Sequence, residues 1–149
     1  GKVDNEKKLK KGFDIKWDPD GYHYNWSGNG VLTYDDNSTY EGNIKNGKYN
    51  GKGKRIYPSN EGDDFVSYYD GDWVDGIQHG QGTYLHPSGW KYEGSWVNGI
   101  MSGTGKFYFH DGTIYKGDVK NNNMNGTGKY YRLINLLTEK RKLTINKEI

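Results

Sequence analysis

A short motif, Y-x-G-x-W or a close variant, recurs along this sequence and constrains its fold more than any other feature. Four copies align without gaps over 14 residues and begin at Tyr40, Tyr69, Tyr92 and Tyr115. Successive copies start 29, 23 and 23 residues apart, and six extra residues within 57–68 account for the longer spacing. Repetition at a fixed period is typical of folds that stack one small unit on the next.

Within each copy the residues alternate as in a β-strand with one buried face. Tyr69, Gly71 and Trp73 alternate with Asp70 and Asp72, which is the period of two that a strand gives its side chains. The glycine between two large side chains is expected to make room for a ring from the neighbouring strand. Each copy ends in a G-x-G pair followed by a run such as KRIY or KFYF. These β-branched and aromatic runs predict a second strand.

Two columns of the repeat contain only glycine and asparagine, and they predict the turns. One column reads Asn37, Asn60, Gly89, Gly112 and Asn135, and the other reads Gly47, Gly76, Gly99 and Asn122. Because these residue types enter the left-handed backbone region at low cost, positive φ is expected at each position. The sequence therefore predicts an all-β fold, an elongated single-layer twisted antiparallel sheet of tandem β-hairpins.

The pattern Y-x-G-x-W-x-x-G-x-x-x-G-x-G with a period of 23 residues resembles the MORN repeat, named for membrane occupation and recognition nexus. The resemblance implies a curved β-sheet array whose grooved aromatic face holds a partner peptide or helix. It also implies a scaffold at a membrane or cytoskeletal structure, and some family members have been proposed to bind phospholipids.

On this pattern the chain divides into four parts. They are a basic N-terminal segment (1–12), a degenerate N-terminal repeat or cap (13–39), four MORN-like repeats (40–135) and a C-terminal cap or tail (136–149). The last part is expected to form either a final strand pair or a short helix.

Composition argues against several classes of protein. There are no cysteines, so neither disulfides nor thiolate chemistry is expected. Leu, Ile, Val and Phe make up only 26 of the 149 residues, whereas aromatic residues reach 15%, so we expect a thin, aromatic core. Residues 12–135 carry 12 basic and 15 acidic side chains. This balance argues against nucleic-acid binding, which requires a basic folded surface.

No arrangement of residues typical of an enzyme stands out from the repeat. Histidines 23, 79, 86 and 110 lack the spacing of metal ligands and are interpreted as turn and strand-surface residues. The G-x-G pairs lead into strands, whereas a dinucleotide-binding loop needs a third glycine and a following helix. We therefore expect a protein that is not an enzyme and uses no cofactor or metal.

The aromatic columns of the repeat supply the candidate partner-binding residues. A single-layer sheet cannot bury both faces, so part of the aromatic ladder should remain accessible as a groove, although the same rings also suit a purely structural core. Trp90 follows a turn at a position where nothing in the repeat demands a tryptophan. It is either a binding anchor or a loop residue that covers a sheet edge. The candidate partner-binding residues are Tyr40, Tyr69, Trp73, Trp90, Tyr92, Trp96 and Tyr115.

A lysine cluster near the N-terminus is a second candidate site. Lys7, Lys8, Lys10 and Lys11 either bind anionic membrane lipids, at roughly 1 kcal/mol for each lysine near the surface, or form a solvated tail. Exposed sheet edges would also allow a homodimer. The leading hypothesis is a cytoplasmic scaffold for a protein partner, peripheral at a membrane or cytoskeleton, and the alternative is a module that binds anionic phospholipids. Carbohydrate binding is disfavoured, because no signal-peptide pattern is found.

Overall fold

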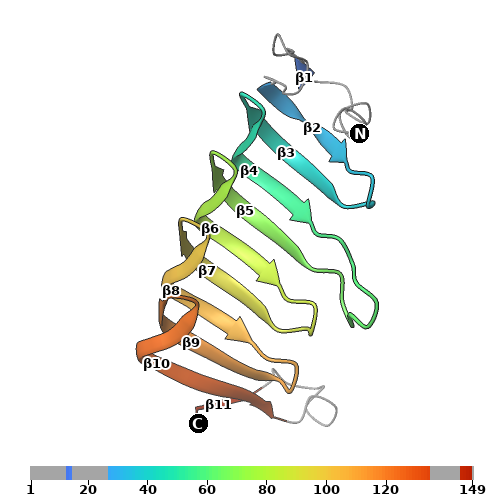
Figure 1. Ribbon diagram of the computed structural model, residues 1–149. Helices are drawn as coiled ribbons and strands as arrows, with labels where there is room; N and C mark the ends of the chain where they lie inside the picture. Colours follow the sequence, from blue (N-terminus) through green and yellow to red (C-terminus); the bar gives the residue numbers. More distant parts are fainter. Residues whose placement is uncertain (1–12, 15–26, 135–144, 149) are drawn as a thin grey trace.

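The computed structural model describes residues 13–14, 27–134 and 145–148. These residues form eleven antiparallel strands in chain order within one open sheet and contain no helix (Figure 1). The prediction of an all-β, single-layer sheet of hairpins is confirmed. The strands are β1 (Phe13–Asp14), β2 (Ser27–Thr33), β3 (Thr39–Lys45), β4 (Lys48–Ile56), β5 (Tyr68–Val74), β6 (Ile77–Leu85), β7 (Lys91–Val97), β8 (Ile100–Tyr108), β9 (Thr113–Lys120), β10 (Asn123–Ile134) and β11 (Ile145–Glu148).

Two-residue turns close one end of each hairpin, from β3–β4 to β9–β10. Both residues of every such turn have positive φ, and the turns are Asn46-Gly47, Asp75-Gly76, Asn98-Gly99 and Asn121-Asn122. Consecutive turns are also hydrogen-bonded to the preceding hairpin, since the Gly99 N–H donates to the Gln78 carbonyl at 2.8 Å. The hairpins therefore stack along the whole array, including their tips.

In the turn column that begins at Asn37, the prediction of positive φ is correct at every described position except one. Asn37, Gly89 and Gly112 have positive φ as predicted, but Asn60 does not. Within the long β4–β5 connection (57–67), Gly62 takes the left-handed conformation with a φ of +92°. The prediction for Asn60 is wrong because the inserted residues move the turn along the chain. Asn135 lies outside the described residues.

A row of glycines, one on each strand from β2 to β10, crosses the sheet in register. They are Gly30, Gly42, Gly53, Gly71, Gly82, Gly94, Gly105, Gly117 and Gly128. The tyrosine of each repeat lies over the second glycine of its G-x-G pair: a Cβ added to Gly82 would lie 2.2 Å from the Tyr69 hydroxyl oxygen. The Tyr69 hydroxyl donates a hydrogen bond to the Asp72 carbonyl at 2.8 Å. A side chain at Gly82 would therefore exclude the buried ring.

The glycine within Y-x-G has a different role from the predicted one. A Cβ on Gly71 would lie 2.4 Å from the Cα of Gly82 on the next strand, so this glycine permits close backbone approach, and the G-x-G glycine makes the room for the ring. The pairing register also shifts between Gly71 and Trp73. At this level the strands bend, and Figure 1 shows the hairpin ends curving out of the plane of the sheet.

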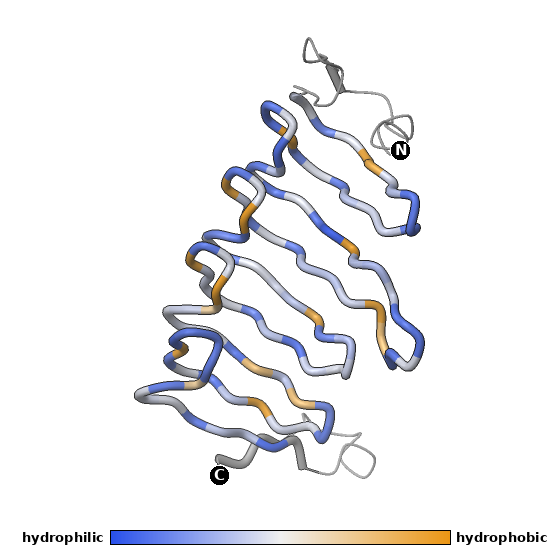
Figure 2. Tube along the Cα trace, in the orientation of Figure 1, coloured by the Kyte–Doolittle hydropathy of each residue, from blue (hydrophilic) through white to orange (hydrophobic). Residues whose placement is uncertain are grey.

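The two faces of the sheet differ in chemistry. We call the face that bears Tyr40, Tyr69, Tyr92 and Tyr115 the aromatic face, and the face that bears Glu41, Asp70, Glu93 and Lys116 the polar face. The core lies on the aromatic face, where tyrosine and tryptophan pack with Leu32, Met101 and Phe107. Strongly hydrophobic residues form only scattered spots along the chain (Figure 2). The expectation of a thin core of rings is therefore confirmed.

Candidate functional site

A groove of about 630 Å³ lies on the aromatic face between the body of the sheet and the tips of the bent hairpins. We call it the Trp90 groove. Its lining residues are Tyr57, Pro58, Asn60, Ser67, Gln78, Tyr84, His86, Pro87, Trp90, Trp96, Gly99, Met101 and Asn122. None of these is an aspartate, glutamate, lysine or arginine, and most carry rings or apolar groups. The lining therefore suits an apolar ligand group with a few neutral hydrogen-bonding atoms around it.

Trp90 is held in this groove by other rings. His86 stacks on it with ring centroids 4.7 Å apart and an angle of 14° between the planes, and Tyr84 meets it edge-on at 5.6 Å. The turn that joins β6 to β7 fixes its backbone, because the His86 N–H donates to the Trp90 carbonyl at 2.9 Å. Trp90 is only half-buried. A rigid aromatic surface is thus presented to the groove.

Toward the N-terminal end of the array, side chains on the two sides of the bend are hydrogen-bonded to each other across the aromatic face. The Tyr34 hydroxyl is hydrogen-bonded to the Tyr49 hydroxyl, and the Gln78 side-chain amide donates to the Tyr57 hydroxyl at 3.0 Å. The next equivalent pair is His86 and Met101, and a thioether is a poor hydrogen-bonding group. Methionine thus replaces the polar member of this pair, and both His86 and Met101 line the groove.

Burial raises the pKa of tyrosine hydroxyls in and beside the groove. Desolvation raises the pKa of Tyr57 above its usual value, although the hydrogen bond from Gln78 partly offsets this rise. Desolvation likewise raises the pKa of Tyr49. These hydroxyls therefore stay protonated at neutral pH and contribute polarity without charge.

Comparison with known families identifies the repeat unit. The model of the MORN repeat matches residues 22–39, 40–61, 69–91, 92–114 and 115–132. The chain belongs to the MORN repeat family. Repeats of this kind are generally found where proteins interact with membranes or with other proteins. None of the curated proteins compared with this MORN chain matches it significantly.

The MORN array buries the aromatic columns from which partner contacts were predicted. Tyr40, Tyr69 and Tyr92 have no exposed surface, and Tyr115 is 4% exposed. Trp73 and Trp96 are also buried, and their indole N–H groups donate to the carbonyls of Gly53 and Gly82 at 2.9 and 3.1 Å. These six rings form the core of the free protein. Of them, only Trp96 lines the Trp90 groove.

Apart from Trp90 and Trp96, the groove is lined by residues that the sequence analysis did not single out for partner binding. Tyr57, Tyr84 and His86 follow the G-x-G pairs, in runs that were interpreted only as strands, and Met101 follows the turn of the β7–β8 hairpin. His86, interpreted as a turn or strand-surface residue, lies at the turn after β6 and also stacks on Trp90. The alternation of side chains along each strand places these residues on the aromatic face, but it is the bend of the sheet that gathers them around one groove.

The remaining predictions concern the N-terminal lysines, metal binding and the C-terminal segment. Lys7, Lys8, Lys10 and Lys11 lie outside the described residues, so lipid binding by this cluster stays a prediction. Within the described residues no group of histidine and acidic side chains could hold a metal ion. The same residues contain no helix that could cross a membrane. In the C-terminal segment, β11 pairs antiparallel with β10, which agrees with the strand alternative for residues 145–148.

Proposed function

We propose that this MORN array is a non-enzymatic protein-interaction module whose Trp90 groove holds an apolar anchor from a peptide or helix of a partner protein. The observation that carries the proposal is a half-buried tryptophan, stacked on His86, in a groove without charged side chains. We further propose that the array acts as a scaffold at a membrane or cytoskeletal structure, as its family suggests.

The energetics of interfaces support this role for Trp90. Tryptophan is among the residues that contribute most to binding, and truncating such an anchor to alanine commonly weakens binding by about 2 kcal/mol or more. The Trp90 side chain is ordered by neighbouring rings before a ligand arrives, so little conformational entropy is lost on binding. The core tryptophans, by contrast, already use their surfaces and N–H groups within the sheet.

Selection of peptides on the purified protein tests the proposal. A displayed peptide library is selected on the wild type, and the affinity of each enriched peptide is then measured by calorimetry for the wild type and Trp90→Ala. We expect the peptides to share one or two large apolar residues. Their affinity should fall by about thirtyfold in Trp90→Ala, which corresponds to about 2 kcal/mol.

The matched control is Val74→Ala. Val74 is 49% exposed and is not part of the groove lining, so its truncation removes exposed apolar surface from the sheet outside the groove. Circular dichroism verifies that both variants are folded. Enriched peptides that bind Trp90→Ala as tightly as the wild type would place the interaction surface elsewhere.

A further inference from the structure

A row of charged side chains crosses the polar face, and its sequence of charges changes at β8. From β3 to β7 the opposed residues of this row are Glu41, Lys54, Asp70, Thr83 and Glu93, so each acid faces a lysine or a neutral residue. In β8, β9 and β10 the row continues with Lys106, Lys116 and Lys129, each directly opposite the next. Glu93 on β7 lies directly opposite Lys106, and from Lys106 onward three lysines stand side by side with no acid between them.

This arrangement is unfavourable for the isolated sheet. Side chains directly opposite one another have Cβ atoms about 4.5–5.5 Å apart, and like charges in such pairs destabilise the sheet. Among the described residues, no carboxylate lies within ion-pairing distance of Lys106 or Lys116. The neighbouring Glu93 accepts a hydrogen bond from the Tyr108 hydroxyl at 2.7 Å and lies 3.9 Å from Lys91. Lys116 therefore has a lysine directly opposite it on both neighbouring strands, and an anion bound between Lys106 and Lys116 would reduce this repulsion.

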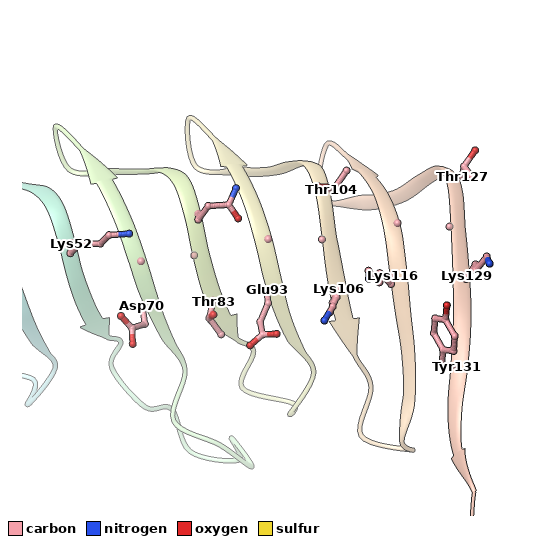
Figure 3. A pocket seen from close by; sticks show the side chains of 17 residues that line it. Lys52, Asp70, Thr83, Glu93, Thr104, Lys106, Lys116, Thr127, Lys129 and Tyr131 are labelled. Carbon is pink, nitrogen blue, oxygen red and sulfur yellow. The ribbon is translucent and has the colours of Figure 1, made fainter. Parts of the chain in front are cut away.

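The surroundings of the lysines provide further ligand contacts. A shallow depression of about 900 Å³ runs over this face and includes the hydroxyls of Thr104 and Thr127 (Figure 3). A smaller one of about 210 Å³ adjoins the lysines. It is lined by Lys106, Tyr108, Ile114, Lys116 and Tyr131. Two cationic groups thus lie at one end of a small hollow whose other end is largely apolar.

We infer that Lys106 and Lys116, with Lys129 beside them, bind a phosphomonoester carried by a side chain of a partner protein. A phosphomonoester brings a charge of roughly −1.5 to −2 and three acceptor oxygens into one group, which matches adjacent ammonium groups better than a single carboxylate does. The organic stem of the phosphorylated side chain packs against Tyr108, Ile114 and Tyr131. This site is on the opposite face from the Trp90 groove and does not depend on it.

The acids of the polar face argue for a compact ligand rather than a membrane. Asp70 and Glu93 line the same depression as the lysines (Figure 3). An anionic leaflet broad enough to cover the lysine row would also press against these carboxylates, and like charges repel. A phosphorylated side chain reaches the lysines without covering the acids.

Amide NMR of the ¹⁵N-labelled protein tests the site with N-acetyl-O-phosphotyrosine amide as the probe. We expect saturable shifts that cluster at β8, β9 and β10, and none with the unphosphorylated N-acetyltyrosine amide. In Lys106→Gln/Lys116→Gln the affinity should fall about tenfold or more, because each lost charge-assisted hydrogen bond weakens binding by roughly that factor. The matched control is Lys45→Gln/Lys48→Gln, which removes another directly opposed lysine pair from the first hairpin and should bind like the wild type.

Thermal unfolding and vesicle flotation complete the test. Since the opposed lysines repel, Lys106→Gln/Lys116→Gln should unfold at the wild-type temperature or above it. A clear drop would assign the lysines to the stability of the sheet and overturn the inference. Equal shifts with both probes, or equal weakening in both double variants, would also overturn it. So would flotation with phosphatidylcholine/phosphatidylserine vesicles that depends on Lys106 and Lys116 while the phosphotyrosine probe does not bind.

Discussion

The substitution Gly82→Ala tests whether the buried tyrosines determine the glycines of the repeat. The new Cβ would lie 2.2 Å from the hydroxyl oxygen of Tyr69 and 2.4 Å from two of its ring carbons, so the ring has to move. Moving it overpacks the core, at about 1–3 kcal/mol, and breaks the hydrogen bond to the Asp72 carbonyl, at about 0.5–1.5 kcal/mol. The stiffer unfolded chain returns about 0.4–1 kcal/mol. We expect the free energy of unfolding to fall by about 0.5–4 kcal/mol.

A second background isolates the contribution of the ring. In Tyr69→Leu the shorter side chain leaves the space above Gly82 empty, so an added methyl group meets no atoms of a ring. Gly82→Ala should then be neutral or stabilise the protein by up to about 1 kcal/mol. The coupling energy between the two positions is therefore expected to be at least about 1.5 kcal/mol.

Urea denaturation of the four proteins, followed by tryptophan fluorescence and circular dichroism, measures this cycle. Each free energy of unfolding is obtained by linear extrapolation, and equal slopes verify that the unfolding reactions are comparable. If Gly82→Ala costs the same in both backgrounds, the Tyr69 ring is not the reason for the glycine, and our account of the G-x-G pair is wrong.

Three further predictions concern other features of the sheet. Asn37 has a φ of +70°. Asn37→Gly should therefore change the free energy of unfolding by only a few tenths of a kcal/mol, whereas Asn37→Val should lower it by about 1–2 kcal/mol. Equal effects of the two substitutions in urea denaturation would contradict this prediction. Trp73→Phe removes the buried hydrogen bond to the Gly53 carbonyl and leaves that carbonyl without its partner, so denaturation should show a loss of about 1–3 kcal/mol. Burial raises the pKa of Tyr92 to about 12, and burial with the hydrogen bond to Glu93 raises that of Tyr108 to about 12. Because the folded state favours the protonated phenols, the free energy of unfolding should be maintained up to about pH 10 and decline between pH 10 and 12. Tyrosinate absorbance that shows all fourteen tyrosines ionised before circular dichroism is lost would contradict this prediction.

The turns were predictable because the backbone conformation of each is decided locally. Gly76 and Gly99 occupy positions of positive φ, and few residue types other than glycine and asparagine tolerate that region. The prediction of positive φ at Asn60 was wrong because this residue was placed in the column by an alignment across the inserted residues. Residues inserted into a loop adopt a turn of their own, which here lies at Gly62.

The location of the groove could be predicted only in part. Trp90 was recognised because it breaks the repeat, and it does line the groove. Alternation along a strand states which face a residue occupies, but it does not show that the sheet bends. The bend lies where the backbones of Gly71 and Gly82 approach closely and the pairing register shifts, and both features belong to the pairing of two strands, which alternation along one strand does not describe. Residues such as Tyr57 and Met101 therefore gave no separate signal.

The Trp90 groove and the lysine row lie on opposite faces of the sheet. On β8, Phe107 packs on the aromatic face within 6.0 Å of Trp90, measured between ring centroids, while the adjacent Lys106 points to the polar face. The period of two that builds the strand thus separates the Trp90 groove from the lysine row by the thickness of one sheet. A ligand in the groove leaves the lysines uncovered, so substitutions at Lys106 and at Trp90 should act independently. For a partner that contacts both faces, the two substitutions should therefore change the binding free energy additively. Strong coupling between them would contradict this and would show that the sheet transmits strain between its faces.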